Sequence, residues 1–166
     1  ATEHLISRGY RNILAIQGVL SSMPSKERVR GFLQAVEDHA GLGVAHNVCG
    51  DAFSVENGYR EAMRALTGEE RPDAIFAFST TILLGAIKAI KELGLKIPED
   101  VALISFDNNR FLDYLDPAVT RVEQPVNVVG KLVTDNIIKM VEKDDDIPLS
   151  SSQILIRPTL IEGRSC

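Results

Sequence analysis

The sequence predicts an α/β fold: a doubly wound, mainly parallel sheet with helices on both faces. Short apolar runs without polar alternation, such as residues 101–106, are typical of strands that are buried on both faces. Four expected strands, of which 47–49 is short and weak, alternate with segments of helical periodicity between residues 12 and 106, and this alternation indicates βαβ units. A chain of 166 residues is long enough to bury one core of its own.

The first two thirds of the chain read as strands and helices in turn. The expected helices are 2–8, 25–40, 54–66 and 80–93, and the expected strands are 12–16, 47–49, 73–78 and 101–106. Ser54 is placed to cap the third helix, and Gly9 and Gly94 to end the first and fourth. The second helix carries a predicted core stripe at i, i+3, i+4 and i+7, made of Val29, Phe32, Leu33 and Val36.

After residue 106 the alternation loosens. We expect a short irregular segment at 110–117, a strand at 119–122 and a helix with one apolar face at 126–143. A last strand is expected at 153–161, and it contains Pro158. Proline cannot donate a backbone hydrogen bond, so this strand is expected at an edge of the sheet. The acidic run 144–146 between the last helix and strand reads as a solvated loop.

Charge and cysteine content exclude several classes of function. The net charge is −5 and the isoelectric point about 5.2, so this segment is not expected to hold nucleic acid by itself, because phosphate binding needs clustered Lys and Arg. The two cysteines, Cys49 and Cys166, stand far apart and predict no disulfide framework, which favours a reducing compartment such as the cytoplasm. The chain opens inside a helical pattern without a methionine, so we expect a preceding part.

Motifs for catalysis, cofactors and metals are missing from the sequence. There is no P-loop, no G-x-S-x-G elbow and no H-E-x-x-H spacing around His4, His39 or His46. The glycines at 41 and 43 follow a helix rather than a strand, so they read as a helix stop and not as a dinucleotide fingerprint. We therefore expect a protein that is not an enzyme, with no catalytic residue, cofactor or metal.

Polar residues stand where predicted parallel strands end, and ligands collect at that edge of open parallel sheets. Asp107 follows the strand 101–106, Ser79 follows 73–78, and Arg28 lies beyond the loop after 12–16. A guanidinium fork and a carboxylate suit a small molecule rich in donors and acceptors. The alternatives are that Asp107 caps a turn and that Arg28 is a solvated helix charge.

At this point the residues resemble a known family. The stretches that carry the resemblance are His4–Ile13, Glu27–Phe32, Pro72–Phe76, Gly85–Ile90, Leu93–Asp107 and Leu115–Pro125. They are similar to the C-terminal, effector-binding part of bacterial transcription regulators of the lactose-repressor/galactose-repressor family. The resemblance covers essentially the whole chain in order, and Ile97–Asp107 is its most specific stretch.

The resemblance implies a cytoplasmic homodimer with an N-terminal helix-turn-helix domain that binds operator DNA, and with two lobes like those of periplasmic sugar-binding proteins. A small effector between the lobes would alter operator affinity. Residues 1–124 would form the C-terminal lobe, 125–148 a returning segment of the N-terminal lobe, and 149–166 a final strand crossing back with the C-terminal tail. The DNA-binding domain and most of the N-terminal lobe would then lie outside this chain.

The resemblance also implies individual roles. Arg28 and Asp107 match the effector-contacting Arg and Asp of the family, and Phe53 stands where relatives place an aromatic that stacks on the ligand. Gln124 is a further residue of the pocket. In the family the effector is usually a sugar or a nucleobase, and we expect a carbohydrate here.

Three positions carry weaker implications. Ser79 stands where most relatives have an Asn that touches the effector, and a hydroxyl reaches less far than an amide. Tyr114 and Leu115 lie in a segment that contributes to the homodimer interface of relatives, with ordinary core packing as the alternative. For the whole chain, the alternative function is a solute-binding protein of a sugar transport system, which would have the same lobes.

Overall fold

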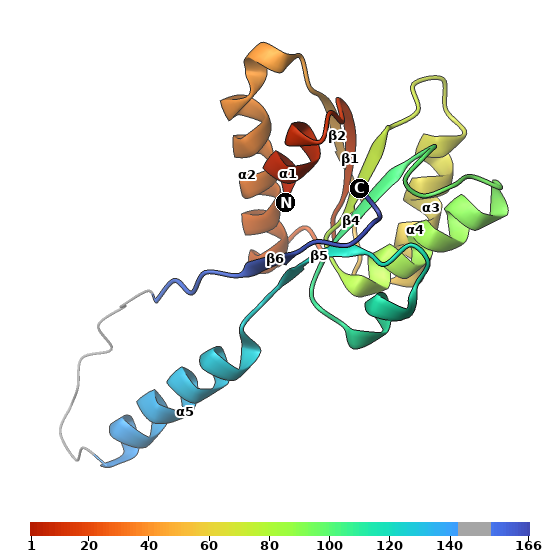
Figure 1. Ribbon diagram of the computed structural model, residues 1–166. Coiled ribbons are helices and arrows are strands. Elements are labelled where there is room, and N and C mark those ends of the chain that lie inside the picture. The colour runs from red at the N-terminus through yellow and green to blue at the C-terminus, as the bar shows by residue number, and fades with distance from the viewer. Residues whose placement is uncertain (143–153) are drawn as a thin grey trace.

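The computed structural model describes residues 1–142 and 154–166. Its centre is one six-stranded sheet in the order β2-β1-β3-β4-β5-β6 (Figure 1). The first five strands along the chain run parallel, and β6 pairs antiparallel with β5. The strands are β1 Asn12–Ile16, β2 Ala45–Cys49, β3 Ala74–Ala77, β4 Ala102–Phe106, β5 Thr120–Glu123 and β6 Thr159–Ile161. The prediction of a mainly parallel sheet is confirmed.

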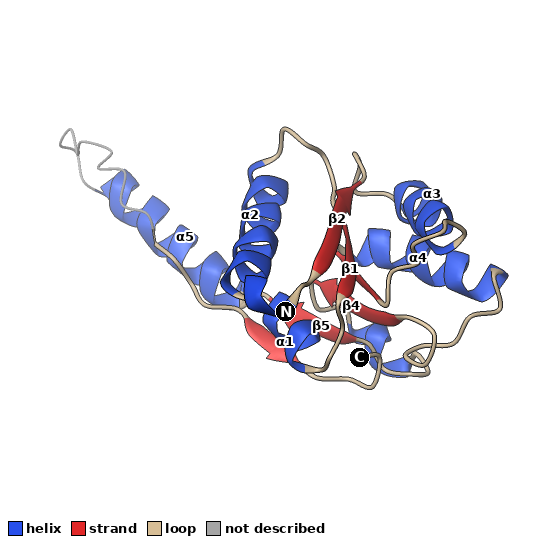
Figure 2. Cartoon of the chain, turned by 90° about the horizontal axis from the view of Figure 1, so that it is seen from above, coloured by secondary structure: helices blue, strands red, loops and turns tan. Residues whose placement is uncertain are grey.

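Helices cover both faces of the sheet, as Figure 2 shows. They are α1 Thr2–Ser7, α2 Met23–Asp38, α3 Val55–Leu66, α4 Thr80–Glu92 and α5 Val126–Glu142, with two short 3₁₀ helices, η1 Ala40–Leu42 and η2 Arg110–Tyr114. Alternate strand residues supply two separate cores, since Leu14 and Ile16 pack with α3 and α4, whereas Ile13 and Ala15 pack with α1 and α2. Two apolar faces explain why the inner strands β1, β3 and β4 read as nearly unbroken apolar runs.

Helix α2 begins two residues before the predicted start. Ser22 is its N-cap, and its hydroxyl accepts a hydrogen bond from the Ser25 amide at 3.3 Å. The predicted core stripe is wrong at Leu33, which is 40% exposed, while Ala35 is buried. Phe32 takes the inward position beside it, and the helical period alone does not decide which of two adjacent apolar residues points inward.

Helices α3 and α4 cross in backbone contact through two glycines. A Cβ on Gly58 of α3 would lie 2.1 Å from the Ile82 carbonyl oxygen, and a Cβ on Gly85 of α4 would lie 2.1 Å from the Val55 carbonyl oxygen. Glycine permits so close an approach because it has no side chain. The crossing fixes both helix N-termini, which directly follow the loops after β2 and β3.

Helix α5 projects away from the sheet (Figure 1). Its exposed apolar residues are Val126, Val128, Val129, Val133, Ile137, Ile138, Met140 and Val141. None of the helices among the described residues has the length and apolar character to cross a membrane.

The last strand is shorter than predicted. β6 spans Thr159–Ile161 rather than 153–161, because Pro158 directly precedes the hydrogen-bonded residues and cannot donate to the ladder. Its expected place at an edge of the sheet is confirmed. Residue 153 and the acidic run 144–146 lie outside the described residues.

Candidate ligand-binding site

The carboxyl ends of the parallel strands form one rim of the sheet. Ser79 comes two residues after β3, while Asp107 and Gln124 directly follow β4 and β5. The register brings these ends level, because Ala77 pairs with Ser105 and Phe106 pairs with Val122. Polar side chains that stand far apart in the sequence are thereby gathered at the edge where open parallel sheets bind ligands.

Arg28 reaches this rim from α2. Its Nη1 donates to the Phe78 carbonyl oxygen at 2.6 Å, and its guanidinium carbon lies 3.9 Å from the centre of the Phe106 ring. Nη2 lies 3.9 Å from Asp107 Oδ1. The side chain is only 15% exposed, so Arg28 is not a solvated helix charge. Burial lowers the pKa of Arg28, and the carboxylate of Asp107 opposes that shift.

Asp107 has a left-handed backbone, with φ of 77°, which Asp tolerates better than most residues. The Gln124 amide donates to Asp107 Oδ1 at 2.5 Å, so the two strand ends are linked. Among the described residues no donor is bonded to Oδ2, and the side chain is 39% exposed. A carboxylate held in this way can accept hydrogen bonds from a ligand at the rim.

The other two predicted residues lie elsewhere on the rim. The Phe53 ring packs on Gly18, where a Cβ would lie 2.3 Å from a ring carbon, so it stands beyond the ends of β1 and β2. Ser79 is buried as the N-cap of α4, and its hydroxyl accepts from the Ile82 amide at 3.2 Å and lies 2.9 Å from the Thr81 hydroxyl. The structure thus brings together Arg28, Asp107 and Gln124, while Ser79 is engaged in capping.

Sequence reasoning missed the residues that fasten the loop carrying Asp107. Arg121 is 5% exposed, and it donates to Asn108 Oδ1 at 2.5 Å and to Asp113 Oδ1 at 2.7 Å. Asn108 donates in turn to Glu123 at 2.5 Å. These bonds attach the loop after β4 to β5. The available signal was an arginine inside the predicted strand 119–122, because a cation that a sheet buries needs partners.

A hollow of about 590 Å³ opens beside this cluster on the face covered by α1 and α2. Arg28, Phe106 and Gln124 form part of its wall, together with Phe76 and Val122. Asp107 is not among its lining residues, so the rim that carries the polar cluster, rather than this hollow, is the candidate site. Within the described part of the chain, no three His, Cys, Asp or Glu side chains are grouped so as to hold a metal ion.

The chain belongs to the family of periplasmic binding protein-like domains, whose profile matches residues 2–166. Among curated proteins it is similar to the HTH-type transcriptional repressor PurR of Klebsiella pneumoniae, at 36% identity over 99% of this chain and 48% of the relative. It therefore spans about half the length of the curated relatives that it matches.

Solved structures agree with this assignment. A sugar-binding transcriptional regulator of the LacI family from Escherichia coli, complexed with phosphate, is 26% identical with a TM-score of 0.84, over 99% of this chain and 58% of that chain. A lac repressor dimer bound to operator and an anti-inducer shares the fold at a TM-score of 0.83 and 23% identity, over 98% of this chain and 55% of that chain. The family recognised in the sequence is confirmed, and these relatives are transcriptional regulators, two of them named as repressors, rather than enzymes.

Proposed function

We propose that this chain is the effector-binding region of a DNA-binding transcription regulator. The observation that carries the proposal is the cluster of Arg28, Asp107 and Gln124 at the carboxyl rim of five parallel strands. It offers a cation, a carboxylate with free accepting capacity and an amide within one small area. The transcriptional repressors among the relatives favour regulation over solute transport.

The proposed effector is a carbohydrate. Sugar hydroxyls both donate and accept, so they can bond to the Asp107 carboxylate and to the amide of Gln124 at once. Phe53 and Gly18 offer an apolar surface at the same rim for the face of a sugar ring. The relative from Escherichia coli is described as sugar-binding, which supports this class of ligand.

We further propose that the effector is enclosed by a second lobe. Residues 1–124 would be the C-terminal lobe, 125–148 part of the N-terminal lobe, and 149–166 the strand that crosses back with the tail. The exposed apolar side chains of α5 support this division, because a helix with such a face needs a partner to cover it. The operator-binding domain would precede this chain, and the intact regulator would act in the cytoplasm.

The intact regulator is proposed to be a homodimer. Tyr114, at the end of η2, is 87% exposed and fits an interface, since exposed aromatic residues are enriched there. Leu115 beside it packs against the core on the α3 and α4 side, so its contribution to an interface would be the smaller of the two.

The test is calorimetric titration of the full-length protein with sugars first ranked by thermal shift. Arg28→Ala and Asp107→Ala should each weaken binding by about 1.5–3 kcal/mol, the scale of hydrogen bonds to charged groups, or roughly ten- to 150-fold. Arg30→Ala is the matched control, because Arg30 lies on the same helix, is 77% exposed and pairs only with Glu27 among the described residues. Unchanged affinity in both site variants would remove this cluster from the effector site.

A further inference from the structure

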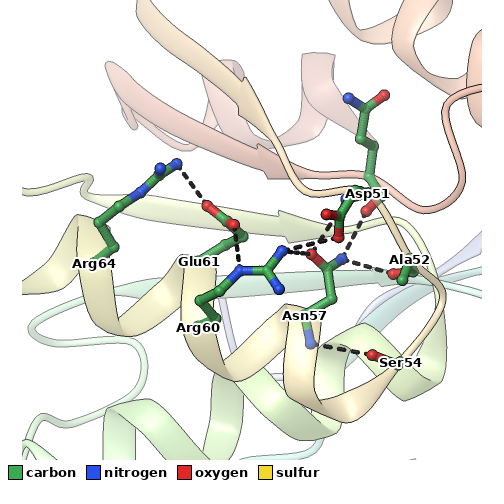
Figure 3. Close-up of polar contacts among 8 residues, drawn as sticks. Asp51, Ala52, Ser54, Asn57, Arg60, Glu61 and Arg64 are labelled. Carbon is green, nitrogen blue, oxygen red and sulfur yellow. Dashed lines mark hydrogen bonds and ion pairs between the residues drawn. The ribbon is translucent and has the colours of Figure 1, made fainter.

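Asn57 is a buried amide whose hydrogen-bonding capacity is completely used. It lies in the first turn of α3 and is 1% exposed. Its Nδ2 donates to the carbonyl oxygens of Gln17 at 2.9 Å and Ala52 at 2.6 Å. Its Oδ1 accepts from the Asp51 amide at 3.2 Å and from Arg60 Nη2 at 3.0 Å (Figure 3). Two donors and one carbonyl oxygen are all that an Asn side chain offers.

These bonds surround the contact between Phe53 and Gly18. Ala52 comes directly before Phe53, and the Ser54 hydroxyl directly after it accepts from the Asn57 backbone amide at 3.1 Å. Gln17, whose carbonyl oxygen accepts from Asn57 Nδ2, directly precedes Gly18. Asn57 therefore ties down the neighbours of both contacting residues, across two loops that follow different strands.

An ion-pair network extends from Arg60, which donates to the Asn57 side-chain oxygen, as Figure 3 shows. Arg60 Nη2 also donates to Asp51 Oδ1 at 2.8 Å, and Arg60 Nε donates to Glu61 Oε1 at 2.9 Å. The Glu61 side chain is 7% exposed and pairs with Arg64 at 2.5 Å. Arg60 thereby fixes the orientation of the Asn57 amide, because its guanidinium can bond only to the oxygen side.

We infer that Asn57 is a positioning residue that holds the Phe53 ring on Gly18 and so sets effector affinity through Phe53. This inference rests on the proposed function, in which Phe53 offers a surface to the ligand. A serine at position 57 cannot reach Gln17 and Ala52 at once. An aspartate would turn an oxygen toward two carbonyl oxygens, so it would repel the loops that the amide binds.

The first experiment needs no effector. The chain contains no tryptophan, so Phe53→Trp provides a reporter in full-length protein from which tryptophans outside this chain have been removed. Acrylamide quenching of this residue should increase on Asn57→Ser and should stay unchanged on Asn47→Ser, a control at an exposed position of β2. Arg60→Met removes the hydrogen bond to the Asn57 oxygen and should also increase quenching. The Arg60 side chain is 53% exposed, so this change should not destabilise the core. Equal quenching in all three variants and the parent would overturn the inference.

The second experiment is a double-mutant cycle on binding, titrating the full-length protein with D-glucose, D-galactose, D-ribose and sucrose. Asn57→Ser should weaken the tightest of these about tenfold when Phe53 is present. The same change should have less than about a twofold effect when Phe53 is replaced by alanine, because coupled residues are not additive. Equal losses in both backgrounds would refute positioning through Phe53. If Arg28→Ala still weakens binding in that case, the proposed function stands and only this inference fails.

Discussion

The crossing of α3 and α4 gives a prediction whose size follows from the structure. In Gly85→Ala the new Cβ would lie 2.1 Å from the Val55 carbonyl oxygen and 2.4 Å from the Tyr59 amide nitrogen. The shorter of these distances is about 1.3 Å less than the 3.4 Å at which ordinary contact begins. Both obstacles are backbone, so the helices have to separate. We expect an overpacking cost of about 3 kcal/mol. Alanine has a better helix propensity than glycine, which stabilises the chain by about 1 kcal/mol. The free energy of unfolding should therefore fall by about 2 kcal/mol in total.

Urea denaturation followed by circular dichroism measures this loss, and thermal melting should show a decrease of about 4–8 °C for a chain of this size. The matched control is Gly31→Ala in α2, where a Cβ meets nothing within 4 Å. There the same substitution should raise the free energy of unfolding by about 0.5–1 kcal/mol. If Gly85→Ala stabilises the chain as Gly31→Ala does, the backbone contact between the two helices does not exist as described.

Two further predictions concern single side chains. Burial raises the pKa of the Cys49 thiol to about 12, with a further contribution from the Glu61 carboxylate, whereas the unfolded thiol titrates near 9.0. As the pH rises, the unfolded chain therefore loses this proton before the folded chain does. The free energy of unfolding of the parent, relative to that of Cys49→Ala, should fall by about 1.4 kcal/mol per pH unit from pH 9 toward 12. A difference between the two proteins that is constant with pH would contradict this. Asp107→Ala should be about 1 kcal/mol less stable than Asp107→Gly, because both variants lose the carboxylate but only alanine keeps a Cβ in the left-handed region. Equal denaturation midpoints for the two variants would exclude backbone strain at this position.

The sequence predicted the sheet well because its signals are local. The apolar run at 101–106, the capping Ser54 and the glycine that ends α1 each act within a few residues, and the structure has each of them in its expected role. The error at Leu33 has a different origin. The spacing of apolar residues along a helix shows that it has an apolar side. The neighbouring elements decide which residues on that side are buried.

The candidate site was predictable in part for the same reason. Asp107 could be found because it directly follows a strand, and a parallel sheet brings such ends together, whereas Gln124 was expected only from the family resemblance. Asn57 could not be found in this way, since its partners include a carbonyl forty residues away in sequence. Ser79 was placed correctly at the end of its strand, but its use as a helix cap depends on the backbone geometry that follows.

The antiparallel pairing of β5 with β6 joins the two passages of the chain between the sheet and α5. Glu123 on the outgoing strand pairs with Thr159 on the returning one, and Gln124 is the next residue outward. β5 is also paired with β4 on its other side, so the segment that leads to α5 starts from inside the sheet. Through its amide, which donates to the Asp107 carboxylate, Gln124 therefore bonds the start of the segment leading to α5 to the loop that follows β4.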